Sequence, residues 1–434
     1  MYASVNHYRV YDIIVGMHRC LVIPGTFLPY NDTVTQLVYK QLRLLDLQYD
    51  VVSLSAGEDP ELKELLQKDP NGKKFQIRNT DDYNNVLFSI HNVFLPKALH
   101  HMHRYIQDAA DSYNGQEVIY TSSWPCYTIR AGKQIKQAHP EVLWIASFCD
   151  PINHSPYKYD EATYRSYSLP EKIAFHLYCH YYVVDQDEAD AFERADSLVF
   201  ICPEQRDFML EQYEKYFHHI GRNELLKKCI IVPLNYIPEW NQVQPSETPV
   251  HHDVYTLSHF GRVYGLRLIE EFIYAVQTFH EKHPEISFRI EQYGEFRKSD
   301  EELIRKCGLG QIFTVHDKIP YKECIEKMNE SDAVLLFDTI LPETEFQPYL
   351  PSKILEYSLL KKDTLGISTS RSPAYRIMKE SNALVCRYDR DDIEKGLEEL
   401  IIDHHPSVIR YATDNETAVQ PLKEAVRQWF ADHH

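Results

Sequence analysis

The sequence has no apolar run of the roughly 18–20 residues that a membrane-spanning helix requires. Residues 1–16 carry few positive charges and only a short apolar run, unlike a secretory signal. The nine cysteines are scattered singly, with no Cys-x-x-Cys pair and no zinc-ligand spacing. These absences predict a cytoplasmic protein with reduced thiols and no metal site, whose contact with the inner face of the cell membrane would be peripheral.

Basic residues are also scarce, because 46 Lys and Arg stand against 64 Asp and Glu, for a net charge of −18. This balance argues against a nucleic-acid partner, which would need a basic face. An apolar content of 44% indicates packed domains, and 434 residues are too many for one ordinary core. We expect domains at 1–237 and 253–415, joined by a proline-containing polar linker at 238–252.

Short apolar runs followed by helical patterns predict α/β domains with doubly wound parallel sheets. Residues 20–24 and 50–54 read as strands, and apolar residues at helical spacing lie between them. Ligands of such sheets bind at the carboxyl ends of strands. The loop after the first expected strand holds one glycine, Gly25, followed by Thr26, and we expect it to form one wall of a ligand cleft. The polar and charged residues 55–85 are expected to form a loop or a small excursion.

Residues 349–357 read Tyr-Leu-Pro-Ser-Lys-Ile-Leu-Glu-Tyr and predict a helix that opens at Pro351, where the missing N–H costs nothing. Leu350 cannot cap that helix, so its first-turn N–H groups and the positive end of its dipole would face an anion. Lys353 and Glu356, three residues apart, share a face. A lysine suits a phosphate, and a carboxylate suits the hydroxyls of a ribose. The alternative is a surface Lys–Glu pair on a buried helix start.

This run resembles the nucleotide-sugar helix of bacterial family-4 glycosyltransferases, whose GT-B fold consists of two Rossmann-like domains facing a central cleft. The resemblance implies that Ser352 and Lys353 lie near the diphosphate of the sugar donor and that Glu356 binds the ribose. It also implies that a final helix within 416–434 returns to the first domain.

Two further segments of the second half resemble the same family. Residues 257–267 read as strand, glycine turn and helix, and the resemblance implies that Gly261, Arg262 and Arg267 hold the diphosphate, for which two guanidinium groups are well suited. A plain strand–helix connection is the alternative. Residues 331–338 resemble the strand before the donor loop. The family also places the nucleobase near the turns that hold, in this chain, Gly294, Pro320 and Tyr321.

In the first half, residues 117–125 and 142–151 resemble the family's two strands that end in an aromatic-proline loop and an Asp-Pro loop. Asp150 is the candidate catalytic base for the acceptor hydroxyl, and the alternative is that it caps the following turn. Thr26, Trp124 and His154 are the candidate acceptor-binding residues. The amphipathic, locally basic residues 92–106 are either a face for anionic lipid or an ordinary surface helix. The tyrosine-rich residues 153–190 either grip the acceptor or form an aromatic core.

The chain departs from the family at Pro348, where many members carry a glutamate that contacts the sugar. Glu343, Glu345 and Gln347 lie near enough in sequence to replace it. The resemblance implies a retaining transferase that needs no cofactor. It would move a sugar from a nucleotide diphosphate sugar, with UDP favoured and dTDP or GDP as alternatives, to a glycan or lipid-linked acceptor for a surface polysaccharide. A sugar-nucleotide 2-epimerase and a non-catalytic nucleotide-sugar-binding subunit are alternative functions.

Overall fold

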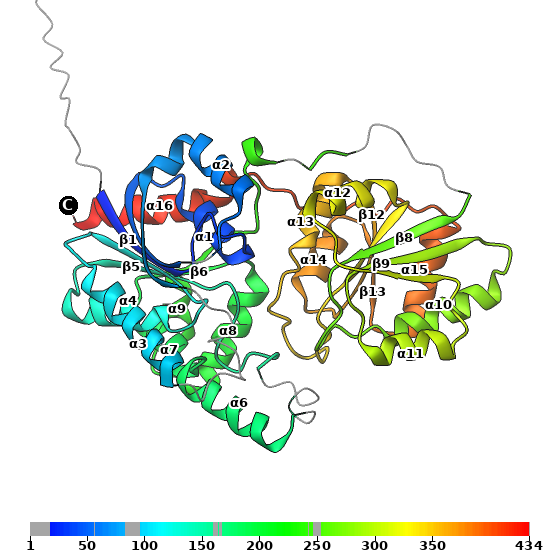
Figure 1. The fold of residues 1–434 in the computed structure, drawn as a ribbon, viewed down its shortest axis with the longest axis horizontal. Helices are drawn as coiled ribbons and strands as arrows, with labels where there is room; N and C mark the ends of the chain where they lie inside the picture. The colour runs from blue at the N-terminus through cyan, green and yellow to red at the C-terminus, as the bar shows by residue number, and fades with distance from the viewer. Residues whose placement is uncertain are drawn as a thin grey trace, which may run out of the picture.

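The chain folds into two lobes, each built on one parallel sheet with helices on both faces (Figure 1). The computed structural model describes residues 18–55, 57–82, 96–158, 164, 167–241, 243–245 and 253–433. Three parts of the sequence interpretation lie outside these ranges: residues 1–16, residues 242 and 246–252 of the expected linker, and residues 92–95 of the amphipathic stretch. No helix within them is long and apolar enough to cross a bilayer.

The first sheet has seven strands in the order β3-β2-β1-β4-β5-β6-β7, all parallel. Its strands are β1 (His18–Gly25), β2 (Leu47–Ser55), β3 (Phe75–Asp82), β4 (Val118–Ser122), β5 (Leu143–Ser147), β6 (Ser197–Phe200) and β7 (Cys229–Ile231). The helices of this lobe are α1 (Thr33–Leu42), α2 (Pro60–Lys68), α3 (Pro96–Asp111), α4 (Thr128–Ala138), α6 (Leu169–Tyr181), α7 (Asp185–Arg194), α8 (Pro203–Tyr216) and α9 (Arg222–Lys228). The expectation of a loop over 55–85 is therefore wrong, because α2 and β3 occupy most of it.

The second sheet has six strands in the order β10-β9-β8-β11-β12-β13, again all parallel. Its strands are β8 (Tyr255–Phe260), β9 (Phe288–Tyr293), β10 (Phe313–His316), β11 (Ala333–Phe337), β12 (Asp363–Ser368) and β13 (Leu384–Arg387). The helices are α10 (Glu270–Lys282), α11 (Lys298–Lys306), α12 (Tyr321–Glu330), α13 (Lys353–Leu360), α14 (Pro373–Glu380) and α15 (Arg390–Ile401). The helix expected to open at Pro351 begins two residues later, because Pro351 and Ser352 form a turn whose carbonyls accept from Ile354 and Leu355.

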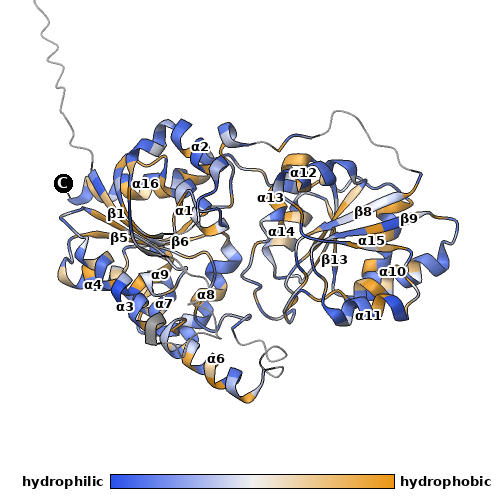
Figure 2. Cartoon of the chain, in the orientation of Figure 1, coloured by the Kyte–Doolittle hydropathy of each residue, from blue (hydrophilic) through white to orange (hydrophobic). Residues whose placement is uncertain are grey.

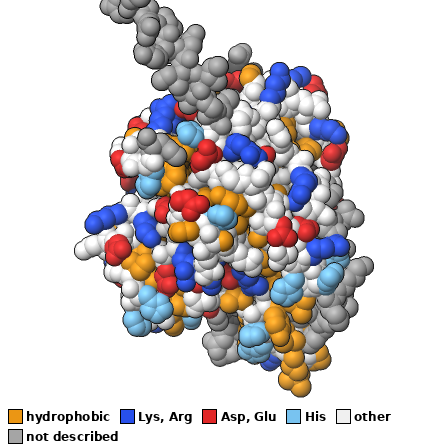
Figure 3. All heavy atoms as spheres, turned by 90° about the vertical axis from the view of Figure 1, so that its left-hand side faces the viewer, with side chains coloured by type: hydrophobic (Ala, Val, Ile, Leu, Met, Phe, Trp, Pro, Cys, Tyr) orange, Lys and Arg blue, Asp and Glu red, His pale blue; other side chains and the backbone are white. Residues whose placement is uncertain are grey.

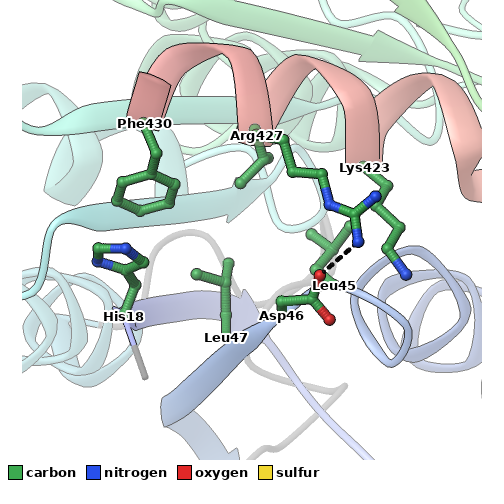
Figure 4. A pocket seen from close by; sticks show the side chains of 8 residues that line it. His18, Leu45, Asp46, Leu47, Lys423, Arg427 and Phe430 are labelled. Atoms are coloured by element: carbon green, nitrogen blue, oxygen red, sulfur yellow. Dashed lines mark hydrogen bonds and ion pairs between the residues drawn. The ribbon is translucent and has the colours of Figure 1, made fainter. Parts of the chain in front are cut away.

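The final helix, α16 (Asn415–His433), crosses back and lies along the first lobe (Figure 1). Its residues Val419, Leu422 and Val426 join the apolar core of that lobe. Figure 4 shows its outer half beside the amino-terminal ends of β1 and β2, where Arg427 pairs with Asp46 at 2.8 Å and Phe430 stacks on the imidazole of His18 with ring centroids 3.7 Å apart. The chain thus passes between the lobes twice, which ties them together near one end.

Candidate functional site at the facing strand ends

Each sheet has a switch point, where neighbouring strands send their chains in opposite directions and leave room for a ligand at their carboxyl ends. In the first sheet this point lies between β1 and β4, and in the second between β8 and β11. The loops at these points are the ones that carry Thr26 and Trp124 in the first lobe and Arg267 and the 338–350 segment in the second. The topology therefore places most of the predicted site residues at strand ends where ligands bind.

Two glycine turns of the second lobe lie against each other. A Cβ on Gly294, whose φ is +126°, would lie 2.6 Å from the carbonyl oxygen of Gly261, so only glycine fits. The side-chain amide of Gln292 donates to both carbonyls, at 2.7 Å to Gly261 and 3.2 Å to Gly294. A Cβ on Gly261 would meet no atom within 4 Å. The Gly261 turn is therefore fixed from behind and open in front, which suits close approach of a ligand to the backbone.

Positive charge gathers beside these turns around the buried His259. Its Nδ1 donates to the Gln292 side chain at 2.7 Å. Burial, and after it the charges of Arg267 and Lys353, lower the pKa of His259 to about 3, so the imidazole is neutral at physiological pH. Arg267 and Lys353 thus lie close enough to act on one group, although they come from different loops. The Nε of Arg267 is buried and bonds no residue in the described part of the chain.

Arg262 lies further out than Arg267. Its side chain is 66% exposed and pairs with Glu295, likewise exposed, at 3.1 Å. Both guanidinium groups lie over the ring of Tyr264, with Arg267 at 5.2 Å and Arg262 at 5.9 Å from its centroid. The structure therefore separates the two predicted arginines into one that lies inward and one at the rim.

Helix α13 presents Lys353 and Glu356 from its first turn, which has no side-chain cap at Ser352. Helix α12 beside it begins after Pro320, also without a side-chain cap. The Tyr321 side chain is 53% exposed, yet desolvation of its phenol, and after it the Glu356 carboxylate next to it, raise the pKa of that phenol. Oε2 of Glu356 is buried and accepts no hydrogen bond from the described residues. An acceptor oxygen without a donor is a ready partner for a ligand hydroxyl.

In the first lobe, Asp150 follows β5 and approaches the second lobe. Its side chain reaches solvent, yet enough protein surrounds it that desolvation raises the pKa of its carboxyl to about 7. Burial, and then the charge of Asp150, raise the pKa of Tyr349, which precedes α13. A carboxyl that titrates near neutrality beside the second lobe can exchange a proton there. The residue is thus placed where the sequence predicts a base, and its role stays a prediction.

The other residues predicted for the first lobe have different surroundings. The loops after β4 and β5 are joined where the Cys149 amide donates to Ser123 Oγ at 3.2 Å. Next to this contact the Trp124 side chain is 42% exposed, whereas Thr26 is buried. His154 stacks on Tyr216 of α8 with centroids 3.5 Å apart. The structure thus places Trp124 beside the Asp150 loop and holds His154 against α8.

The segment 338–350 is held by a buried carboxylate, Asp338. It accepts hydrogen bonds from Gln347 and from Ser368 and Ser372 of the neighbouring strand end and helix. The Glu343 carboxylate accepts from the amide of Ser370 at 2.9 Å. Two of the three side chains that could replace the missing glutamate are therefore used to shape this segment, and Glu345 points to solvent.

No family model matches the chain, and no curated protein matches it. Among solved structures, it is similar to sucrose-phosphate synthase from Thermosynechococcus elongatus, with a TM-score of 0.59 and 11% identity over 95% of this chain and 99% of that one. It is also similar to Anabaena HepE in complex with UDP (TM-score 0.59, 12% identity, 95% and 100% covered). A third similar structure is the lipopolysaccharide outer core galactosyltransferase WaaB in its apo form (0.53, 10%, 96% and 100%). These neighbours confirm the GT-B fold class predicted from the sequence, and membership of family 4 stays a prediction.

Proposed function

We propose that this protein is a retaining glycosyltransferase that moves a sugar from a nucleotide diphosphate sugar to a glycan or lipid-linked acceptor, in the synthesis of a cell-surface polysaccharide. The observation that carries the proposal is the cluster at the second switch point. There Arg267, Lys353 and the uncapped α13 can hold a diphosphate, and the unpaired oxygen of Glu356 can accept from a ribose. A UDP-sugar is the favoured donor, with dTDP- and GDP-sugars as alternatives, and HepE has been observed with UDP.

The reaction forms a bond between the acceptor oxygen and the anomeric carbon and breaks the bond from that carbon to the diphosphate. Arg267, Lys353 and the helix dipole would stabilise the negative charge that develops on the leaving diphosphate, in place of a divalent cation. Asp150 would take the proton of the acceptor hydroxyl, which its pKa near 7 allows. For retention, the acceptor must attack from the side on which the diphosphate leaves.

The first experiment is a thermal-shift screen against UDP-, dTDP- and GDP-sugars, because a ligand that binds only the folded state raises the melting temperature. A donor that stabilises the protein is then incubated with it alone and with acceptor extracts, in the presence of EDTA. Transfer that persists in EDTA supports the proposal. A changed sugar without acceptor would indicate an epimerase, and binding without any turnover would indicate a binding subunit.

We also propose that the acceptor is met at the inner face of the cell membrane. Helix α6 lies at the lower end of the first lobe in Figures 1 and 2, and we call this end the foot. Its exposed residues include Leu169 (73% exposed) and Ile173 (49%), followed by His176 and His180. Figure 3 shows an apolar projection with histidines around it at this foot. Exposed apolar side chains on one face of a surface helix are typical of a lipid-contacting helix. Co-sedimentation with phosphatidylglycerol vesicles that is lost in Leu169→Gln/Ile173→Gln supports this surface; no sedimentation of the wild type would contradict it.

A further inference from the structure

The loop that follows Asp150, residues 151–158, belongs to the first lobe and contacts the second. We name it the bridging loop. Its start is fixed by Glu188 of α7, whose buried carboxylate accepts from the amides of Ile152 at 2.7 Å and Asn153 at 3.1 Å. Its end is fixed by Lys158, whose ammonium group donates to Asp185 at 2.7 Å. Both anchors lie on one helix of the first lobe, so the middle of the loop is held in a defined position.

The middle of the bridging loop contacts the second lobe through two side chains. The hydroxyl of Tyr157 lies 2.9 Å from Oγ1 of the buried Thr339, and the hydroxyl of Ser155 lies 2.8 Å from that of Tyr349. The rings of Tyr157 and Tyr349 also make an edge-to-face contact, with centroids 5.0 Å apart. Thr339 and Tyr349 belong to the segment that leads into α13, so the bridging loop contacts the chain just before the helix that carries Lys353.

Tyr157 also reaches the turn that carries Arg267. Gly265 lies under its ring with φ of +53°, and a Cβ there would come within 3.0 Å of the ring. The ring of Tyr264 lies 5.9 Å from that of Tyr157 and 5.2 Å from the Arg267 guanidinium. The charge of Arg267 acts on the Tyr157 phenol, whose pKa burial raises to about 12. Arg267 and Tyr157 therefore share one small space, although they belong to different lobes.

We propose that Tyr157 of the first lobe is a positioning residue for the donor diphosphate that the second lobe holds, a step that rests on the proposed function. Its ring lies against Gly265 and beside Tyr264, over which the Arg267 guanidinium lies, so it holds the turn that presents this guanidinium to a phosphate. Its hydrogen bond to Thr339 fixes the ring there. Since Tyr157 belongs to the loop that Asp150 directly precedes, the binding of a diphosphate in one lobe is coupled to the placement of the candidate base in the other.

The test compares the affinities of UDP and UMP, measured by isothermal titration calorimetry. UDP and UMP share the base and the ribose, so the ratio of their affinities reports on the terminal phosphate. A general loss of stability would not change this ratio. We expect the preference of the wild type for UDP to fall about tenfold in Tyr157→Ala, or about 1.4 kcal/mol. Tyr157→Phe, which keeps the ring and loses the bond to Thr339, should lower it about threefold.

Two further variants complete the test. Gly265→Ala, whose Cβ would come 3.0 Å from the Tyr157 ring, should push that ring off the turn and lower the UDP preference in the same direction as Tyr157→Ala, so it carries the test if Tyr157→Ala does not fold. Tyr274→Phe, on α10, removes a hydroxyl far from this space and should leave the ratio unchanged. An unchanged ratio in the Tyr157 and Gly265 variants, with UDP still bound by the wild type, overturns this inference alone. A wild type that binds no UDP overturns it together with the UDP form of the proposed function.

Discussion

The chain leaves β1 of the first sheet and β8 of the second at equivalent switch points, but the two loops have opposite chemistry. After β1, the carboxylate of Asp32 caps α1 by accepting from the amide of Val34 at 2.7 Å. After β8, the loop carries Arg262 and Arg267 and enters α10 without a side-chain cap. Both helix starts hold a carboxylate, since Glu270 and Glu271 lie in the first turn of α10 and Glu270 accepts from the amide of Ile269 at 3.1 Å. The attraction for an external anion after β8 therefore comes from the two arginines of the loop.

This difference teaches that sheet order alone does not make an anion site. The loop after β1 is also closed by packing, since Gly25 lies directly against Pro125 and its amide donates to the hydroxyl of Tyr105 at 3.0 Å. The Gly261 turn faces open space. Of two similar halves, the second is therefore better suited than the first to a charged ligand.

The largest effect should come from removing a cation at the second switch point. Arg267→Ala and Lys353→Ala should each lower the rate of transfer by roughly 10²–10³, because each removes a group that stabilises charge in the transition state. The rate is measured as nucleotide release with a saturating donor, and circular dichroism checks the fold. Lys395→Ala, an exposed lysine on α15, is the matched control. Near-normal turnover in both test variants would remove the basis for the comparison.

Asp150→Asn should lower the rate about a hundredfold if Asp150 is the base. In the wild type, the rate should rise about tenfold per pH unit up to about pH 7 and then level off, since the base must be ionised. The native pKa lies above the ordinary value of about 3.9, so this carboxyl stabilises the fold at low pH, and that stability is lost as pH rises from about 4 past 7.

Melting curves of the wild type and Asp150→Asn across this pH range measure the effect of Asp150 on stability separately from its effect on the rate. If Asp150 only caps a turn, the substitution will change the melting temperature and leave the shape of the rate profile intact. That result would remove Asp150 as the candidate base.

Glu356→Gln should weaken recognition of the ribose. The preference for UDP over 2′-deoxy-UDP should fall about tenfold, because a hydrogen bond to a charged acceptor contributes about 1.5–3 kcal/mol. Titration calorimetry gives both affinities, and Glu301→Gln on the exposed side of α11 is the control. Equal losses for the two nucleotides would mean that Glu356 contacts something other than the 2′-hydroxyl.

The smallest effect should come from the first switch point. Asp32→Ala should cost about 1 kcal/mol through loss of the α1 cap and lower the melting temperature of a domain of this size by about 2–4 °C. UDP affinity should not change. A weakened affinity for UDP would show that the loop after β1 takes part in holding the diphosphate and would remove the contrast between the two loops.

Several features were predictable from local patterns. Residues 20–24 and 50–54 fall within β1 and β2. Residues 55–85 were mispredicted for two reasons. The start of α2 has a clear signal, Asp59 capping before Pro60, which the high charge of the segment obscures. Strand β3 lies at the sheet edge, where solvent covers one side and polar residues replace the apolar run of a central strand.

The candidate site was predictable in part. The run from Pro351 to Glu356 indicates an anion-binding helix start because its residues are neighbours in sequence. Tyr157 and His259 were not singled out. A tyrosine in a tyrosine-rich stretch and a histidine inside an apolar strand look like core residues, and only their neighbours in space give them other surroundings.

The sequence by itself determined the alternation of strands and helices, hence two parallel sheets, and the cations that lie near the second switch point. Local chemistry suffices for this, since hydrophobic period and turn residues act over a few positions. The tertiary structure alone decided that Arg267 lies inward while Arg262 pairs with Glu295 at the rim. It also brought Tyr157 to Thr339, 182 residues away. Side-chain direction and contacts across such separations are fixed by packing between lobes, which no local pattern encodes.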